Sequence, residues 1–519
     1  MEPVTRRLVL LILFSVSICG AAGGLWAQEA RSLRFEVTAP PGDEWNSMTG
    51  RLIIVTVPVS GRQTREPRRR IGSVGLDATP IAAVDVNQLA SGQTVVIDET
   101  SATFPFERLS DWPPAEYDVQ AVLDVSRDIR MPGAPGNWYS QPQRVLVEAN
   151  RDLVVSLALT EQVPPEQIPA DTEYVRYVHL PSERLSRYHV RPVVLRAAII
   201  LPYGFDREPL RQYPIRLSVG GYGRRYTAAT RLMRVGSSFR RAWLADDTPR
   251  MLQVVLDGVG PNGDPYQVNS SNNGPYGDAL VEELIPYIES RFRGLGVPEA
   301  RVIDGVSTGG WVALALHVFY PDTFNGAWSY CPDSVDFRAL QRINIYDDAD
   351  AYVEDGSERP SRRGPDGAIR FTMRHEIRME NVLGRGDAWI QSGRQWGAWN
   401  AVYGPRGDDG RPVPLWDQTT GLIDRNVVSH WEQYDLRLVL DQNWATLGPK
   451  LDGKLNVWVG EMDDYYLNDS VHLFDAFLRR RGPTFNARIT YGPGKGHCWV
   501  PHSPEELLKE MGTRVGAKP

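Results

Sequence analysis

The chain has 519 residues, of which 42% are hydrophobic and 10% aromatic, so it can bury a large core and is not a disordered chain. Its 57 Lys and Arg against 64 Asp and Glu give a net charge of −7, which excludes a general electrostatic attraction for nucleic acid. At about 100–200 residues per domain, this length predicts two to four domains.

Residues 1–30 are predicted to be an export signal peptide. Arg6 and Arg7 precede an apolar run over residues 8–18, which is too short to span a bilayer core about 30 Å thick. The mature protein is therefore expected in the periplasm or outside the cell, and no later stretch is apolar enough to span a membrane. Two alternatives for the type of signal stay open. The Arg pair loosely fits a twin-arginine signal, and Cys19 is a candidate lipid-attachment site, although Ile18 before it is large for that role.

Residues 31–160 predict an all-β domain with a sandwich-like architecture. Short apolar runs separated by Gly, Pro, Asn and Asp are typical of such domains. The runs are residues 33–37, 51–55, 94–97, 117–122 and 153–157. A proline-rich connector over residues 161–171 follows, which we expect to be extended and semi-rigid.

Residues 172–519 predict an α/β domain with a mostly parallel central sheet. Apolar strand-like runs alternate here with helical segments, and one such segment over residues 278–293 contains Pro286 as an expected kink. The strand-like runs are residues 195–201, 215–219, 252–256, 302–304, 455–459 and 487–490.

A long insertion over about residues 338–453 interrupts this alternation and carries six of the fifteen tryptophans. Such an excursion is usually a functional lid or an added subdomain. Because it leaves the predicted sheet at the edge where α/β proteins bind ligands, we expect it to form one wall of a binding pocket. The alternative is that its aromatic residues form only a small core of their own.

The sequence Gly305-Val306-Ser307-Thr308-Gly309 matches the G-x-S-x-G pattern between a predicted strand and a predicted helix. A nucleophilic serine needs a tight strand-to-helix turn, where glycines relieve crowding and the next backbone N–H helps to hold an oxyanion. The pentapeptide alone arises easily by chance, but its context predicts a nucleophile at Ser307.

A serine nucleophile needs a histidine base and an acid that orients the histidine. In this fold the acid follows the serine along the chain, and the histidine follows the acid. Of the eight histidines, only His497 and His502 follow the last predicted strand, and a glycine-rich approach over residues 492–496 favours His497. The acid should follow the strand at 455–459, where three carboxylates compete. By position they rank Asp463, Asp464 and Glu461.

An oxyanion hole also needs an N–H from the turn after an earlier strand. The glycine-rich turn over residues 220–223 follows the predicted strand at 215–219. We therefore expect the N–H of Tyr222 or Gly221 to act together with that of Thr308.

With these motifs, residues 195–519 resemble the esterase D, or putative esterase, family of α/β-hydrolases. This family includes S-formylglutathione hydrolases, mycolyltransferases, enterochelin esterases and carbohydrate esterases that act on feruloyl or acetyl xylan. The similar segments are residues 200–202, 220–223, 282–289, 305–310, 320–324, 460–467 and 496–497. The resemblance implies an α/β-hydrolase fold, and it implies Asp463 as the acid because the family places it three residues after a strand-end glycine.

The sequence thus predicts an exported serine esterase without a cofactor, acting on a small-molecule or polysaccharide ester. Ser307 would attack the ester, His497 would move the proton and Asp463 would orient His497. The same triad could instead transfer the acyl group to a sugar hydroxyl. A third hypothesis is a carbohydrate-binding protein with a degenerate hydrolase domain. No Cys/His quartet, zinc helix or EF-hand loop is present, so we expect no metal site.

Cys331 and Cys498 are the two cysteines left after removal of the signal peptide. Cys498 follows His497 directly, and Cys331 ends the strand after the predicted serine, so both should lie at one edge of the sheet. Export favours a disulfide between them, and two buried free thiols are the alternative.

Overall fold

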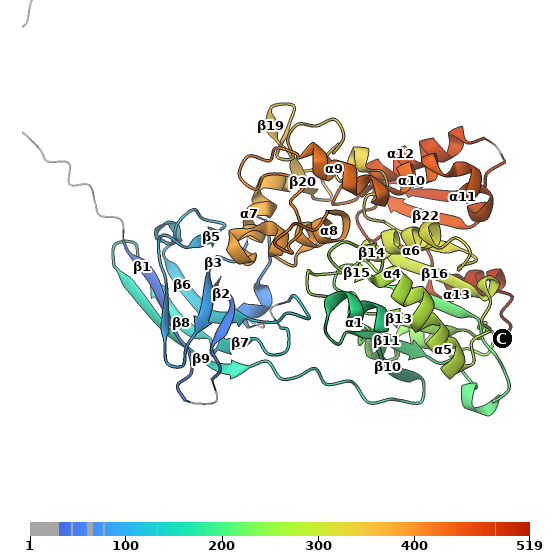
Figure 1. The fold of residues 1–519 in the computed structure, drawn as a ribbon, viewed down its shortest axis with the longest axis horizontal. Helices are drawn as coiled ribbons and strands as arrows, with labels where there is room; N and C mark the ends of the chain where they lie inside the picture. Colours follow the sequence, from blue (N-terminus) through green and yellow to red (C-terminus); the bar gives the residue numbers. More distant parts are fainter. Residues whose placement is uncertain (1–30, 43–44, 60–65, 76–77, 132, 483) are drawn as a thin grey trace, which may run out of the picture.

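The architecture was taken from a computed structural model, which describes residues 31–42, 45–59, 66–75, 78–131, 133–482 and 484–519. The export signal predicted for residues 1–30 lies outside these residues. Two large sheets organise the described chain (Figure 1). No helix among the described residues is both long and apolar enough to cross a membrane.

The N-terminal region is β-rich, as the sequence predicts. Its strands form one nine-stranded sheet in the order β4-β1-β9-β7-β6-β2-β3-β5, with β8 paired to β6. Their bounds are β1 Leu33–Thr38, β2 Met48–Pro58, β3 Ile81–Leu89, β4 Thr94–Ile97, β5 Ala102–Phe104, β6 Ala115–Asp124, β7 Trp138–Ser140, β8 Gln143–Val147 and β9 Leu153–Gln162. Buried residues of β1, such as Phe35, share a core with Leu52 of β2 and Val119 of β6. The sheet therefore folds over its own core.

The second sheet has eight strands in the order β10-β11-β13-β12-β16-β17-β22-β23. Their bounds are β10 Val175–Pro181, β11 Val194–Ile200, β12 Ile215–Val219, β13 Leu252–Leu256, β16 Arg301–Val306, β17 Ala327–Tyr330, β22 Leu455–Gly460 and β23 Ala487–Gly492. The pairs β10/β11 and β11/β13 are antiparallel, and the other pairs are parallel. This confirms the predicted mostly parallel sheet, and it brings the carboxyl ends of β16, β22 and β23 to one edge.

Helices pack around this sheet, and α6 lies directly on β16 and β17. The helix bounds are α1 Glu183–His189, α2 Ala228–Leu232, α3 Ser238–Trp243, α4 Tyr276–Ala279, α5 Ile285–Phe292, α6 Thr308–Phe319, α7 Met373–Leu383, α8 Gln395–Tyr403, α9 Arg425–Trp431, α10 Leu436–Gln442, α11 Trp444–Leu451, α12 Leu467–Arg480 and α13 Pro504–Arg514. The helix expected over residues 278–293 consists of α4, a π-helical turn at Leu280–Leu284 and α5. Pro286 is the second residue of α5, just after the π turn, and it lacks the N–H that a continuous α-helix needs.

The insertion lies between β17 and β22 and includes α7 to α11 and two short hairpins. The hairpins pair β18 Val353–Glu354 with β19 Ser357–Glu358, and β20 Pro360–Arg363 with β21 Ile369–Thr372. A further two-stranded sheet, β14 Asn269–Ser270 with β15 Gly274–Pro275, precedes α4.

Helix α7 joins the insertion to the N-terminal region (Figure 1). Its Met379, Val382 and Leu383 share an apolar cluster with Ile53 and Val55 of β2. Beside this cluster the buried Arg51 side chain donates hydrogen bonds to the Val382 carbonyl at 3.0 Å, to Asp85 at 3.0 Å and to Asp387 at 2.5 Å. The β-rich region therefore supports the outer side of the insertion.

We expect Arg51→Ala to lower the free energy of unfolding by about 1–3 kcal/mol, because it empties a buried position and leaves the Val382 carbonyl without its donor. The matched control is Arg144→Ala, which removes an ion pair between the exposed Arg144 side chain and Asp118 and should have a clearly smaller effect on stability. Thermal unfolding and limited proteolysis of the insertion measure both. Equal effects of the two changes would contradict this role of Arg51.

Candidate active site

Ser307 stands alone between the end of β16 and the start of α6. Its backbone has φ 59° and ψ −124°, a conformation that costs energy for any residue with a side chain. The Ser307 N–H donates to the carbonyl of Tyr330 in β17 at 2.8 Å, which helps to hold this strained turn. The sharp strand-to-helix turn predicted from the G-x-S-x-G pattern is present in the structure.

The two glycines of the pattern are required by packing. A Cβ atom on Gly305 would lie 1.9 Å from the carbonyl oxygen of Gly309, and one on Gly309 would lie 2.2 Å from the carbonyl oxygen of Val219 in β12. Backbone atoms cannot yield easily, so only glycine lets β16, α6 and β12 approach this closely.

We expect Gly309→Ala to destabilise the fold by at least about 1–3 kcal/mol, because the added methyl group must push α6 away from β12. Gly133→Ala is the matched control, since an added Cβ there meets nothing within 4 Å, and it should change stability by less than about 0.5 kcal/mol. Denaturant unfolding curves compare the two. A Gly309→Ala variant as stable as the Gly133→Ala variant would contradict the packing argument.

His497 and Asp463 lie beside Ser307, on the loops after β23 and β22. His497 Nε2 is 3.0 Å from Ser307 Oγ, and His497 Nδ1 is 2.8 Å from Asp463 Oδ2. Asp463 is fully buried, and its other oxygen accepts the backbone N–H of Tyr465 at 3.0 Å. The structure thus brings the three residues together in one hydrogen-bonded chain.

The competing residues have other partners. Asp464 accepts the backbone N–H of His497 at 3.1 Å and pairs with Arg362 at 3.2 Å, so it holds the histidine loop from the side. Glu461 is exposed. His502 Nδ1 is 3.1 Å from the hydroxyl of Tyr330.

The charge of His497 depends on two neighbours. Burial lowers the pKa of His497, but hydrogen bonds with Asp463 and Cys498 stabilise the imidazolium and together raise the pKa to about 10. The pKa of the Cys498 thiol is lowered to about 5, because contacts with Cys331 and His497 stabilise the thiolate and outweigh burial. His497 and Cys498 therefore titrate as a coupled pair.

The three residues expected to supply oxyanion donors surround Ser307. A Cβ on Gly221 would lie 3.6 Å from Ser307 Cβ, Tyr222 lines the same cavity as Ser307, and Thr308 opens α6. Among the hydrogen bonds of the described residues, none uses the backbone N–H of Tyr222 or of Thr308. Both amides are therefore available to a ligand oxygen.

A cavity of about 180 Å³ opens over Ser307 and His497. The insertion provides Gln341, Glu376, Gln395 and Trp399 to its wall, as its position in the sequence predicts. Among the six insertion tryptophans Trp399 alone lines this cavity in the described chain. Trp389 and Trp396 both pack on Trp416. Part of the insertion therefore has the small aromatic core of its own that was the alternative to a binding wall.

Asp333 is a cavity residue that the sequence argument did not single out. It is buried, and its Oδ2 atom accepts hydrogen bonds from Tyr266 at 2.7 Å, Thr308 Oγ1 at 3.0 Å and Trp399 at 3.2 Å. Burial raises the pKa of Asp333, and these donors oppose the rise. Asp333 lies three residues after β17, at the same sheet edge as Ser307. This position in the sequence could have identified it as a cavity residue.

The expected disulfide between Cys331 and Cys498 is not formed, and both cysteines are free. Cys331 Sγ instead accepts the backbone N–H of Cys498 at 3.1 Å. The two residues do share one edge of the sheet, but this contact joins the sulfur of one to the backbone of the other. Together with His497 they offer three metal-ligand atoms within 4.8 Å of one another, a group that the sequence analysis did not single out.

Comparison with known proteins gives one family. Residues 194–443 match the family described as Putative esterase. This range includes Tyr222 and Ser307 and ends before Asp463 and His497. No curated protein matches the chain.

Several solved structures are similar to part of the chain. An S-formylglutathione hydrolase from Agrobacterium tumefaciens is 13% identical over 67% of this chain and 99% of its own, with a TM-score of 0.38. A ferulic acid esterase from Anaeromyces mucronatus is 11% identical over 67% of this chain and 94% of its own, with a TM-score of 0.34. A fluorophosphonate-binding serine hydrolase from Staphylococcus aureus is 13% identical over 66% of this chain and 96% of its own, with a TM-score of 0.36.

Proposed function

We propose that the chain, whose residues 194–443 match the putative esterase family, is a carboxylic ester hydrolase, specifically an exported serine esterase with an α/β-hydrolase fold. The observation that carries the proposal is the hydrogen-bonded chain from Ser307 Oγ through His497 to the buried Asp463. The order of these residues after β16, β22 and β23 supports the fold assignment. An assembled triad argues against a degenerate, purely binding domain.

In the first half of the reaction Ser307 Oγ attacks the ester carbonyl. The hydroxyl proton passes to His497 Nε2, which is 3.0 Å away, while Asp463 holds Nδ1–H and stabilises the imidazolium. The carbonyl oxygen becomes an oxyanion, which accepts the backbone N–H groups of Thr308 and Tyr222. His497 then gives its proton to the leaving alcohol, and the acyl group stays on Ser307.

In the second half water replaces the alcohol. His497 takes a proton from the water, the hydroxyl attacks the acyl carbon, and the same two N–H groups hold the second oxyanion. The acid is released when the proton returns to Ser307.

The polar wall of the cavity supports an ester with hydroxyl groups near the scissile bond. Gln341 and Gln395 offer amides, and Glu376 and Asp333 offer carboxyl groups that can accept hydrogen bonds from hydroxyls. Acetyl or feruloyl esters of polysaccharides fit this chemistry. Since export would bring the protein to such external polymers, we propose them as the substrate class.

Initial rates of the purified protein test the proposal, with p-nitrophenyl acetate, a hydroxycinnamoyl ester and acetylated xylan as substrates and the Ser307→Ala variant as background. Hydrolysis of the nitrophenyl ester together with at least one of the other two is expected. No hydrolysis above the Ser307→Ala background would contradict the esterase. Hydrolysis of the nitrophenyl ester alone would contradict the polysaccharide substrates.

The pH dependence of the rate should change in Cys498→Ser. His497 must be neutral to accept the proton of Ser307, so kcat/KM falls as the pH drops through the pKa of His497. Contact with Cys498 raises that pKa, and its removal should therefore move the acid limb of the profile to lower pH. His502→Ala is the control, with an unchanged limb. An acid limb that stays in place or moves to higher pH in Cys498→Ser would contradict the coupling.

A further inference from the structure

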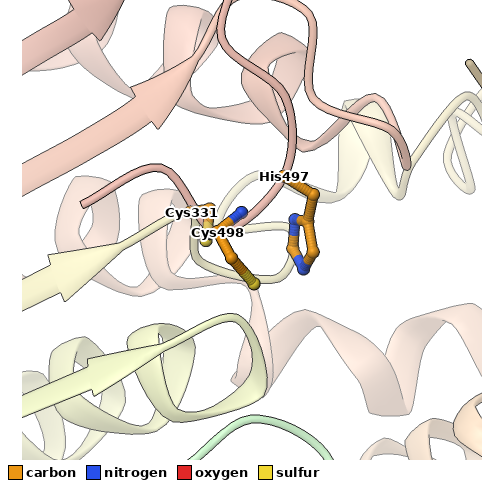
Figure 2. A group of neighbouring side chains, drawn as sticks. All are labelled: Cys331, His497 and Cys498. Carbon is orange, nitrogen blue, oxygen red and sulfur yellow. Dashed lines mark hydrogen bonds between the residues drawn. The ribbon is translucent and has the colours of Figure 1, made fainter. Parts of the chain in front are cut away.

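Two sulfur atoms lie beside the histidine that the proposed mechanism uses as its base. Cys331 follows β17 directly, and Cys498 follows His497 on the loop after β23 (Figure 2). One ligand atom from each of Cys331, His497 and Cys498 lies within 4.8 Å of the other two. Figure 2 shows the three side chains converging from these two loops.

Backbone and side-chain contacts tie the two loops together beside this group. Cys331 and Cys498 both have positive φ values, 40° and 61°, and the Cys498 N–H donates to Cys331 Sγ at 3.1 Å. His497 Nδ1 is held by the buried Asp463, so Nε2, which here contacts Ser307 Oγ, is the ring atom that can bind a cation in place of that contact. A carboxylate on the second ring nitrogen is the usual support of a metal-binding histidine.

The chemistry of the three atoms selects the kind of ligand. Two thiols and one imidazole, with no carboxylate oxygen among them, suit a thiophilic cation such as Zn²⁺ and do not suit Ca²⁺ or Mg²⁺. Zinc bonds of about 2.3 Å to sulfur and about 2.0–2.1 Å to nitrogen place tetrahedral ligand atoms roughly 3.4–3.8 Å apart. Shifts of about 1 Å from the present separations are therefore sufficient.

We propose that Cys331, Cys498 and His497 form a binding site for a thiophilic divalent cation such as Zn²⁺, and that the bound cation switches the esterase off. On binding, both cysteines become thiolate ligands and His497 binds as the neutral imidazole, so the protons that these three groups carry on their ligand atoms pass to solvent. His497 Nε2 gives its lone pair to the cation, so it can no longer accept the proton of Ser307. Cys331 is buried and Cys498 is exposed, so the cation enters from the side of Cys498.

Binding is measured first, because it does not depend on the proposed function. The reduced, chelator-treated full chain is titrated with ZnCl₂ by calorimetry and with CoCl₂ by absorption spectroscopy. We expect about one cation per chain and a sulfur-to-cobalt charge-transfer band, both also present in Ser307→Ala. Loss of one sulfur in Cys498→Ser or Cys331→Ser should weaken binding by at least about 100-fold. The matched control His502→Ala keeps all three ligand atoms and should bind as the unchanged chain does.

Inhibition is measured second, and this half rests on the proposed function. Zn²⁺ should inhibit ester hydrolysis, and EDTA should restore the rate. The rate of each variant with zinc is divided by its own rate without zinc. Measured in this way, inhibition should disappear in Cys498→Ser and persist in His502→Ala. Unchanged inhibition of Cys498→Ser, or cobalt binding without a charge-transfer band, would overturn the site. A chain without titratable thiols at Cys331 and Cys498 when isolated without reductant would also overturn it, because a disulfide removes both sulfur ligands. Binding without activity in the unchanged chain would instead refute the esterase and leave the cation site standing.

Discussion

Replacement of Ser307 by alanine is expected to lower kcat/KM for ester hydrolysis by at least about three orders of magnitude, with no loss of the fold. The triad acts as a unit, so only substrate binding and the oxyanion donors remain once the nucleophile is removed. The alanine side chain also fits the strained turn as well as serine does. Kinetics with p-nitrophenyl acetate and a circular dichroism melting curve measure the two quantities.

Ser271 offers a matched control for this change. Its Oγ atom is 3.3 Å from His430 Nε2, so Ser271→Ala also removes a serine–histidine contact. In the described chain no carboxylate is bonded to His430, and the contact lies outside the cavity over Ser307. Ser271→Ala should therefore keep nearly full activity. More than about a tenth of the activity left in Ser307→Ala would reject Ser307 as the nucleophile.

The second large effect is expected at the acid. Asp463→Asn should lower kcat by about 10³–10⁴-fold, because an amide cannot hold Nδ1–H and stabilise the imidazolium as a carboxylate does. Asp464→Asn keeps an oxygen that can accept the His497 N–H and loses only a pair with the partly exposed Arg362, so its loss should be below about tenfold.

Steady-state kinetics of the two asparagine variants under one set of conditions compare these carboxylates. Equal losses, or a larger loss in Asp464→Asn, would show that the neighbouring carboxylate orients His497. The structure gives the reason for the expected order, since Asp463 contacts the imidazole ring and Asp464 contacts the backbone of the histidine.

The sequence predicted the site best where short-range rules act. A glycine on each side of Ser307 and a strand before it indicate a strained turn, because only glycines allow the backbone contacts seen at Gly305 and Gly309. The order of strands then limits the base to His497 or His502 and the acid to three neighbouring carboxylates. Family resemblance was needed to favour Asp463 further.

Features that depend on distant segments were not predicted. Strand β3 contains Ala82 and Ala83, which give a weak strand pattern, and it is stabilised by pairing with β2 on one side and β5 on the other. The bonds of Asp333 join residues up to 67 positions apart, which no local pattern reveals. The disulfide expectation was wrong because shared position at a sheet edge does not determine which way a sulfur points.

The central claim is that Ser307 becomes covalently acylated with His497 as its base, and a fluorophosphonate probe tests it most directly. Attack of Ser307 Oγ on phosphorus expels fluoride and leaves a stable phosphonate ester, which mass spectrometry locates in a peptide digest. We expect one adduct per chain, on the peptide that carries Ser307, formed far more slowly in His497→Ala and absent in Ser307→Ala. An adduct on another residue, or an active enzyme that forms no adduct, would contradict the account.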